Sequence, residues 1–337
     1  MQQLINNFSI QIGMNAARAL FVFVVLFILL IIPICIAIIL PLFKDRLTPK
    51  LKVYLYAFIT GFFIVMSLFG FMRDAIEKSS LFALQVDANN KNITYLYNVI
   101  LVFGGALVGI IFSFVVKYVI SYKLNKKLMS IKGNKINAFV HVHDHDQNNI
   151  HNHEHPDYIF NRDDTISVAE DAISEKIAGK FKVIALVLLL THRIPEGFIL
   201  GYLINQYINN ENSSLTIAFM ISLVLHLIPE EILFYYRLRD AGYSKSKSIL
   251  ISVSALCLFL PFMLMGAYFA DAISNLDWLF AFLLAAIGGI FLFTSLVEFF
   301  PEFYHTHFDK KTWLKVIIIL LCGVLFAIFI LSFHSHH

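Results

Sequence analysis

Charged residues and cysteines are both scarce in this chain of 337 residues. Asp, Glu, Lys and Arg together make up 15% of the sequence and hydrophobic residues make up 58%, whereas about a quarter of the residues in a typical soluble domain are charged. The composition therefore excludes a soluble globular domain. The three cysteines, Cys35, Cys257 and Cys322, all lie in apolar stretches, which excludes a disulfide framework and a Cys-x-x-Cys metal motif.

Long apolar runs are what the sequence has in place of charge. Eight runs are each long enough to cross about 30 Å of hydrocarbon as a helix. They are residues 20–42, 53–72, 97–121, 181–204, 214–236, 249–270, 277–300 and 313–333. The sequence therefore predicts an all-α polytopic membrane protein with eight transmembrane helices.

Lysine and arginine are absent from two of the short connections between these runs. Residues 205–213 and 271–276 contain no basic residue, whereas residues 43–52 and 237–248 are rich in them. Because basic loops stay in the cytoplasm, we expect an integral protein of the plasma membrane with both termini external. Its expected parts are an external N-terminus with three spans, a cytoplasmic loop, and five spans with an external C-terminus. These parts are residues 1–121, 122–180 and 181–337.

A weak internal repeat relates the second and seventh runs. When residues 61–75 are laid over residues 289–303, five positions are identical and Asp74 matches Glu302 in charge. The two runs cross in opposite directions in this topology, so the repeat would be inverted, as in many transporters that bind their substrate between two halves. We expect spans 1–3 and 6–8 to be related in this way around spans 4 and 5.

The fourth and fifth runs each contain the pattern His-x-x-Pro-Glu. The first pattern runs from His192 to Glu196 and the second from His226 to Glu230, with Glu231 next in the chain. On a helix, residues four apart share a face, and ionisable groups in the membrane cost about 2.5–3.5 kcal/mol each. Either pattern alone is compatible with a kinked helix whose polar groups are satisfied. Their repetition favours a metal-ligand set, and two His with two Glu suit zinc.

Histidines are concentrated in the long loop after the third run. They alternate with other residues, so they cannot line one helical face, and the segment is interpreted as a flexible tract with several ligands. Imidazole and carboxylate groups at this density suit borderline divalent ions, zinc above all. A disordered polar linker without a metal role is the other interpretation. The candidate accessory ligands are His141, His143, His145, His151, His153 and His155.

These features together resemble the ZIP (Zrt/Irt-like) family of divalent metal transporters. The resemblance covers residues 20–333 and includes both His-x-x-Pro-Glu patterns, the histidine-rich loop and the stretch 288–302 in the seventh run. It implies that a divalent metal ion is bound between the fourth and fifth spans and carried toward the cytoplasm. The implied ligands of the first metal site are His192, Glu196, His226 and Glu230, with Glu231 as a further carboxylate.

The sequence departs from the family pattern beside these ligands. Arg193 stands where the family commonly has Asn, and Leu227 where it often has a polar or acidic residue. A guanidinium is always charged and cannot ligate a cation. We therefore expect a site for one metal ion in which Arg193 balances the neighbouring carboxylates. The same charge could instead repel the ion and close the path.

Three functions are compatible with the sequence. The expected one is a carrier that takes up a divalent metal, zinc first. The second is a non-transporting sensor or interaction protein with the ZIP fold, in which Arg193 closes the path. The third is an intramembrane metalloenzyme whose zinc activates water, although His-Glu-x-x-His is absent. We expect no enzyme activity, no prosthetic group and no nucleic acid; the expected partners are metal ions and the lipid bilayer, with a homodimer left open.

Overall fold

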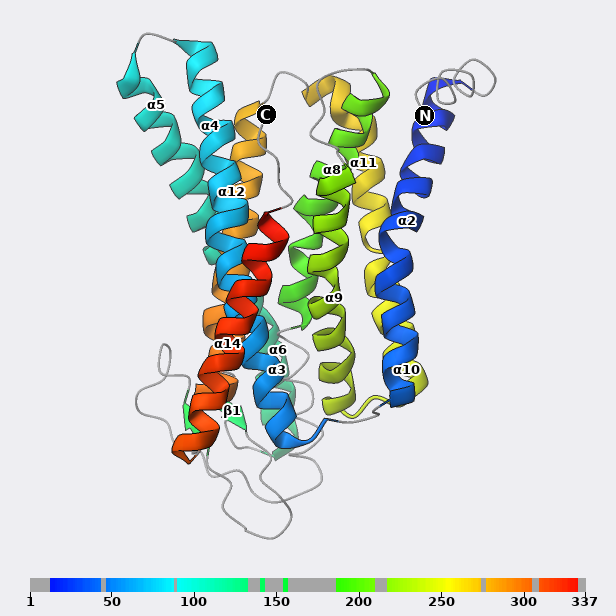
Figure 1. Ribbon diagram of the computed structural model, residues 1–337, viewed down its shortest axis with the longest axis vertical. Helices are drawn as coiled ribbons and strands as arrows, with labels where there is room; N and C mark the ends of the chain where they lie inside the picture. The colour runs from blue at the N-terminus through cyan, green and yellow to red at the C-terminus, as the bar shows by residue number, and fades with distance from the viewer. Residues whose placement is uncertain are drawn as a thin grey trace.

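The described part of the chain consists almost entirely of long helices. The computed structural model describes residues 13–43, 47–87, 90–132, 140–142, 154–156, 186–209, 217–273, 277–304 and 309–332. Within these ranges, seven helical segments are long and apolar enough to cross a membrane, and the helices run side by side along the molecule (Figure 1). The prediction of a helical protein with several membrane-spanning segments is confirmed.

The helices follow one another along the chain as rods, and several rods contain more than one element. In order, they are α2 (Met14–Phe43); α3 (Pro49–Val65), η1 (Met66–Phe71) and α4 (Met72–Val86); α5 (Lys91–Tyr97), η2 (Asn98–Phe103) and α6 (Gly104–Lys132); α8 (Arg193–Ile208); α9 (Ile217–Asp240); α10 (Lys245–Leu256) and α11 (Phe259–Ile273); α12 (Asp277–Phe293), η3 (Thr294–Phe299) and α13 (Phe300–Tyr304); and α14 (Lys310–Leu331). The elements η1, η2 and η3 are π-helical turns within otherwise α-helical rods.

Two rods differ from the apolar runs that predict them. The second rod continues well past the predicted run 53–72. The prediction ends early because the extension α4 mixes charged with apolar residues, and a hydropathy window does not detect such a helix. The sixth rod, predicted as one span at 249–270, is interrupted by a turn that begins at Cys257. Pro261 has no backbone N–H to continue the helix, and the carbonyl of Cys257 accepts from Leu260 at 3.1 Å.

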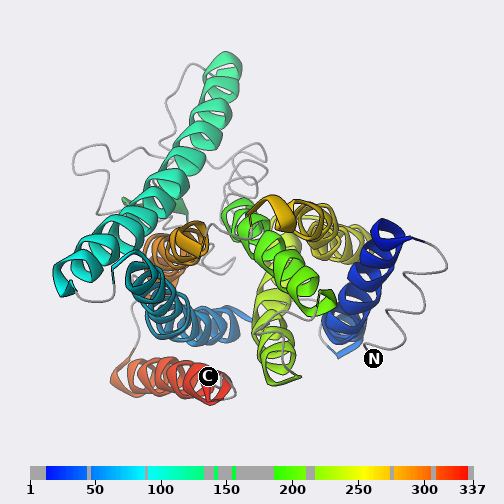
Figure 2. The same cartoon turned by 90° about the horizontal axis from the view of Figure 1, so that it is seen from above.

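The rods form two bundles that stand next to each other (Figure 2). The first bundle contains α2, α8, α9, α10 and α11, and the second bundle contains α3 to α6 and α12 to α14. In the first bundle, α8 packs on α11 and α2 packs on α9; in the second, α12 packs on α6 and α14 packs on α3. The bundles meet where α8 and α9 contact α12, α14 and α3. The two rods with the His-x-x-Pro-Glu patterns therefore lie at the interface.

Consecutive rods cross the molecule in alternating directions. We call the end at which α2 begins and α4 finishes the upper end, since it is at the top of Figure 1. The turns that lead into α3 and α10 lie at the opposite, lower end. Lys52, Arg237 and Lys245 are close to these turns in the chain. The basic connections therefore gather at one end, as the distribution of lysine and arginine predicts.

Glycines allow two pairs of rods in the second bundle to pack backbone against backbone. At each of four glycines, a Cβ atom would overlap a carbonyl oxygen of the neighbouring rod. The pairs of glycine and carbonyl are Gly61 with Leu320 and Gly323 with Phe58 between α3 and α14, and Gly289 with Ala106 and Gly109 with Ala286 between α12 and α6. Small residues permit such close approach in membrane helices. The two crossings are thus built in the same way.

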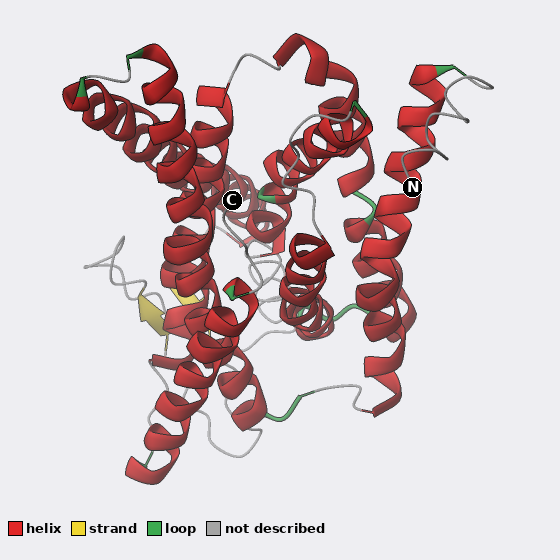
Figure 3. Cartoon of the chain, turned by 45° about the horizontal axis from the view of Figure 1, so that its top comes forward, coloured by secondary structure: helices red, strands yellow, loops and turns green. Residues whose placement is uncertain are grey.

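A short ribbon is the only described structure within the histidine-rich loop. Strand β1 (Val140–Val142) pairs antiparallel with β2 (Glu154–Pro156), and the register sets His141 opposite His155 (Figure 3). The other candidate ligands of this loop, His143, His145, His151 and His153, lie outside the described residues. The backbone therefore brings together two of the six predicted accessory ligands.

Candidate metal centre

The helix with the first His-x-x-Pro-Glu pattern is interrupted at its histidine. Helical residues 186–191 are followed by a turn at His192, and α8 begins at the next residue. Pro195 cannot donate a backbone hydrogen bond to the carbonyl of Thr191, while the N–H of Glu196 still donates to the carbonyl of His192 at 3.2 Å. The missing donor accompanies the interruption in the fourth rod, whereas α9 continues as one helix through Pro229 of the second pattern.

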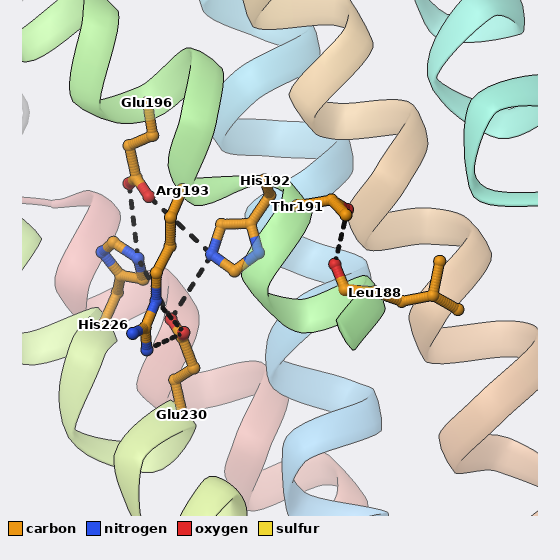
Figure 4. A network of polar contacts seen from close by, with 7 residues as sticks. All are labelled: Leu188, Thr191, His192, Arg193, Glu196, His226 and Glu230. Carbon is orange, nitrogen blue, oxygen red and sulfur yellow. Dashed lines mark hydrogen bonds and ion pairs between the residues drawn. The ribbon is translucent and has the colours of Figure 1, made fainter. Parts of the chain in front are cut away.

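Two histidines and two glutamates from α8 and α9 converge in the interior. His192 Nε2 lies 3.8 Å from Glu196 Oε2 and 3.5 Å from Glu230 Oε2. His226 Nε2 lies 3.4 Å from Glu196 Oε1 and 4.0 Å from Glu230 Oε2 (Figure 4). All four side chains are buried. The structure thus brings together the four residues that the two patterns single out.

The spacing of these atoms fits a small divalent cation. Ligand atoms about 2.0–2.2 Å from a tetrahedral zinc ion are roughly 3.3 Å from one another, close to the distances given above. Among the described residues, one ligand atom each of His192, His226 and Glu230 lie within 4.8 Å of one another. Glu196 is outside this group of three, because it approaches His192 with Oε2 and His226 with Oε1. Both carboxylate oxygens of Glu196 and Oε2 of Glu230 are buried without a hydrogen bond. Buried polar atoms normally have a partner, and a bound cation would supply it.

Arg193 contacts the carboxylate oxygen of Glu230 that does not face the histidines. Its Nε donates to Glu230 Oε1 at 2.9 Å and its Nη2 donates to the same oxygen. The guanidinium lies between the rings of Phe234 and Phe259, at 5.8 and 5.7 Å from their centroids, and is fully buried. Glu230 therefore uses one oxygen for Arg193 and directs the other toward the histidines.

Glu231 faces a different neighbour from Glu230. It is also fully buried, but its Oε1 accepts a hydrogen bond from the hydroxyl of Ser252 on α10. Successive residues of a helix point about 100° apart, so Glu231 turns away when Glu230 faces α8. Among the described residues, Glu231 does not belong to the group of converging ligand atoms.

The second bundle covers the site and leaves an opening toward the upper end. The ring of Phe291 on α12 packs against the imidazole of His192, with centroids 4.3 Å apart. A cavity reaches Glu196 and His226 at one side. Its other lining residues include Met66, Gly70, Phe71 and Asp74 from the second bundle. It lies on the upper side of the site, because it is also lined by Leu200, which follows Glu196 on α8, and by Leu223, which precedes His226 on α9.

The residues of the second bundle near the site lie outside both His-x-x-Pro-Glu patterns. Phe291 and Asp74 belong to the repeated stretches 61–75 and 289–303. The signals that single out these stretches are their mutual similarity and, for residues 288–302, the resemblance to the family. Their closeness to α8 and α9 depends on tertiary packing, which no local pattern contains.

Comparison with protein families gives a match over most of the chain. A family model described as ZIP Zinc transporter matches residues 17–331 of the chain. A search of curated proteins finds no match. The matched region includes both bundles and all residues of the candidate centre.

Proposed function

Because the chain belongs to the ZIP family of zinc transporters, we propose that it is an uptake carrier for zinc with one metal site between α8 and α9. Membership of this family makes it an integral membrane protein that transports divalent metal ions, rather than an enzyme. The cargo, the direction and the ligands are what we propose. The proposed ligands are His192, Glu196, His226 and Glu230.

The observation that carries this proposal is the convergence of the four side chains. Nitrogen and oxygen ligands in equal number suit zinc, and manganese, iron(II), cobalt and cadmium are competitors with related preferences. When ionised, Glu196, Glu230 and Glu231 carry three negative charges. Arg193 together with one divalent ion carries three positive charges. The charges of this region therefore balance for a single metal ion.

We further propose eight spans arranged as an inverted repeat. The helix α9 is 24 residues long and contains only a few charged residues, and we infer that it is the eighth span. Laying residues 61–75 over 289–303 superposes η1 on η3 in the sequence, and it also superposes Gly61 on Gly289. Equal positions of a π-helical turn and of a close-packed glycine support a common origin of the two halves.

The polarity of uptake follows from the basic connections. With the lower end in the cytoplasm of a plasma-membrane protein, both termini are external and the cavity at the upper end opens to the outside. Glu196 and His226 then replace water molecules in the coordination shell of zinc, and His192 and Glu230 complete the coordination. The ion is released at the lower end when the bundles move relative to each other. The paired histidines His141 and His155 would bind released ions below.

A path closed by Arg193 is the alternative proposal. Its guanidinium is bound to Glu230 Oε1, which leaves Oε2 directed at the histidines. This geometry supports a countercharge that holds Glu230 in place, rather than an obstacle between the ligands. Family membership also favours transport over a sensor. A homodimer stays a prediction.

Zinc uptake by proteoliposomes tests the proposal. The wild type is compared with His192→Ala and Arg193→Asn, and with Ile194→Ala as a matched change on the exposed side of α8. We expect uptake by the wild type and Ile194→Ala, and none by His192→Ala. A silent wild type with active Arg193→Asn would instead show that Arg193 closes the path. Uptake that survives His192→Ala would remove this site from the transport path.

A further inference from the structure

The lower end of the interface between the bundles is joined by an ion pair. Arg237 near the end of α9 places Nη1 2.6 Å from Glu302 Oε1 on α13. Arg237 is 3% exposed. The same guanidinium lies over the ring of Tyr56 on α3, with Arg237 Cζ 4.9 Å from the ring centroid. One arginine of the first bundle thus contacts two rods of the second bundle.

Further contacts surround this ion pair. Lys52 Nζ on α3 lies 2.7 Å from Asp240 Oδ1 on α9, one turn beyond Arg237. Between Glu230 and Arg237, the side chains of Leu233 and Phe234 are buried. A zinc ion leaving the site toward the lower end would meet an apolar layer and then the ion pair. Buried apolar side chains and then the ion pair thus follow the site along α9 toward the lower end.

The upper end of the same interface differs. There, the cavity reaches the site, and Asp74 on α4 is the acidic residue that lines it besides Glu196. In the overlay of the repeated stretches, Asp74 and Glu302 occupy the same position. One of the two equivalent carboxylates faces the cavity that leads to the site, and the other is bound by Arg237.

We propose that Asp74 captures the incoming divalent cation, and that the contact of Arg237 with Glu302 and Tyr56 closes the lower end until the ion is released. The proposal rests on the proposed function. A carboxylate in a cleft with apolar walls raises the local cation concentration. A buried arginine beside Glu302 keeps that carboxylate from attracting cations while the upper end is open, and its separation from Glu302 opens the lower end.

Capture by Asp74 is tested by the zinc dependence of uptake. We expect Asp74→Asn to raise the KM for zinc by about tenfold, in line with electrostatic focusing, with kcat and the affinity of the solubilised protein for zinc unchanged. Asp74→Glu should restore the KM. Glu77→Gln, a carboxylate one turn along α4 that does not line the cavity, is the control. An unchanged KM in Asp74→Asn, or a fall in kcat alone, would overturn capture.

Closure by Arg237 is tested without any transport. Leu233→Cys is introduced above the ion pair, and its reaction with a membrane-impermeant thiol reagent applied from the lower side is measured against the background of the natural cysteines. We expect Arg237→Gln to speed this reaction by about tenfold or more, the factor that 1.4 kcal/mol of a lost interaction gives. The exchanged pair Arg237→Glu with Glu302→Arg should restore slow labelling, which also shows that the fold is intact. Equal labelling in Arg237→Gln and its parent, or fast labelling in the exchanged pair, would contradict the proposal, whether or not the protein proves to carry zinc.

Discussion

The two bundles bury charge in different ways. In the second bundle, Lys117 on α6 lies 3.0 Å from Glu298 on η3, and both are buried, so this carboxylate has a cation in direct contact. In the first bundle, Glu196, Glu230 and Glu231 share one close guanidinium, that of Arg193. The cluster around Arg193 therefore holds more carboxylates than close cations, which favours a bound cation. The comparison supports the proposed metal site around Glu196 and Glu230.

Loss of Glu230 should have the largest effect, because its carboxylate contacts both histidines and Arg193. We expect Glu230→Ala to abolish zinc binding and to lower the free energy of unfolding by about 3–5 kcal/mol, the cost of a buried charge without its partner. Titration calorimetry and thermal unfolding of the solubilised protein measure the two effects. Adding Arg193→Met should recover stability without recovering binding. Zinc affinity that survives Glu230→Ala would mean that the bundles do not differ as described.

The ion pair of the second bundle should matter for stability alone. We expect Lys117→Met to lower the free energy of unfolding by about 3 kcal/mol, because Glu298 is left buried without its cation. The double variant with Glu298→Gln should regain most of this loss. Zinc affinity should change by less than about twofold in the double variant, since distant sites act independently. A tenfold loss of affinity there would extend the metal site into the second bundle.

The close crossings of the second bundle should tolerate no added methyl group. A Cβ at Gly289 would overlap the carbonyl oxygen of Ala106, so we expect Gly289→Ala to cost about 1–3 kcal/mol of unfolding free energy. The repeat predicts a similar cost for Gly61→Ala. Gly104→Ala is the control, because nothing lies within 4 Å of its added methyl group. Unequal costs at Gly61 and Gly289 would weaken the inferred symmetry.

The sequence predicts those parts of the molecule that depend on local pattern. Apolar runs predict the rods, since membrane helices satisfy their own backbone hydrogen bonds. The spacing of His192 and Glu196, and of His226 and Glu230, predicts a shared helical face. The membership of the ZIP family that these patterns indicate is confirmed. Eight spans and both external termini stay predictions.

Contacts between distant rods could not be predicted in the same way. Nothing in the sequence pairs Arg237 with Glu302, which are 65 residues apart, or brings Phe291 against His192. Which carboxylate Arg193 binds likewise depends on where α9 lies, because the side chain of Arg193 could reach more than one of them. These features follow from the packing of two bundles, and periodicity within one helix carries no information about that packing.

The smallest effect is expected at Glu231, where the sequence and the geometry favour different roles. The resemblance to the family gives Glu231 as a further metal ligand, whereas its side chain accepts a hydrogen bond from Ser252 on α10. Glu231→Gln keeps an oxygen for that hydrogen bond and nearly the same volume. We expect zinc affinity to fall by less than about threefold, because the charge of Glu231 lies outside the group of ligand atoms. A loss of about 1.4 kcal/mol would lower the affinity tenfold. Titration calorimetry of Glu231→Gln beside Glu230→Gln measures the difference between adjacent carboxylates. A loss at Glu231 as large as that at Glu230 would make Glu231 a ligand and would require α9 to rotate when zinc binds.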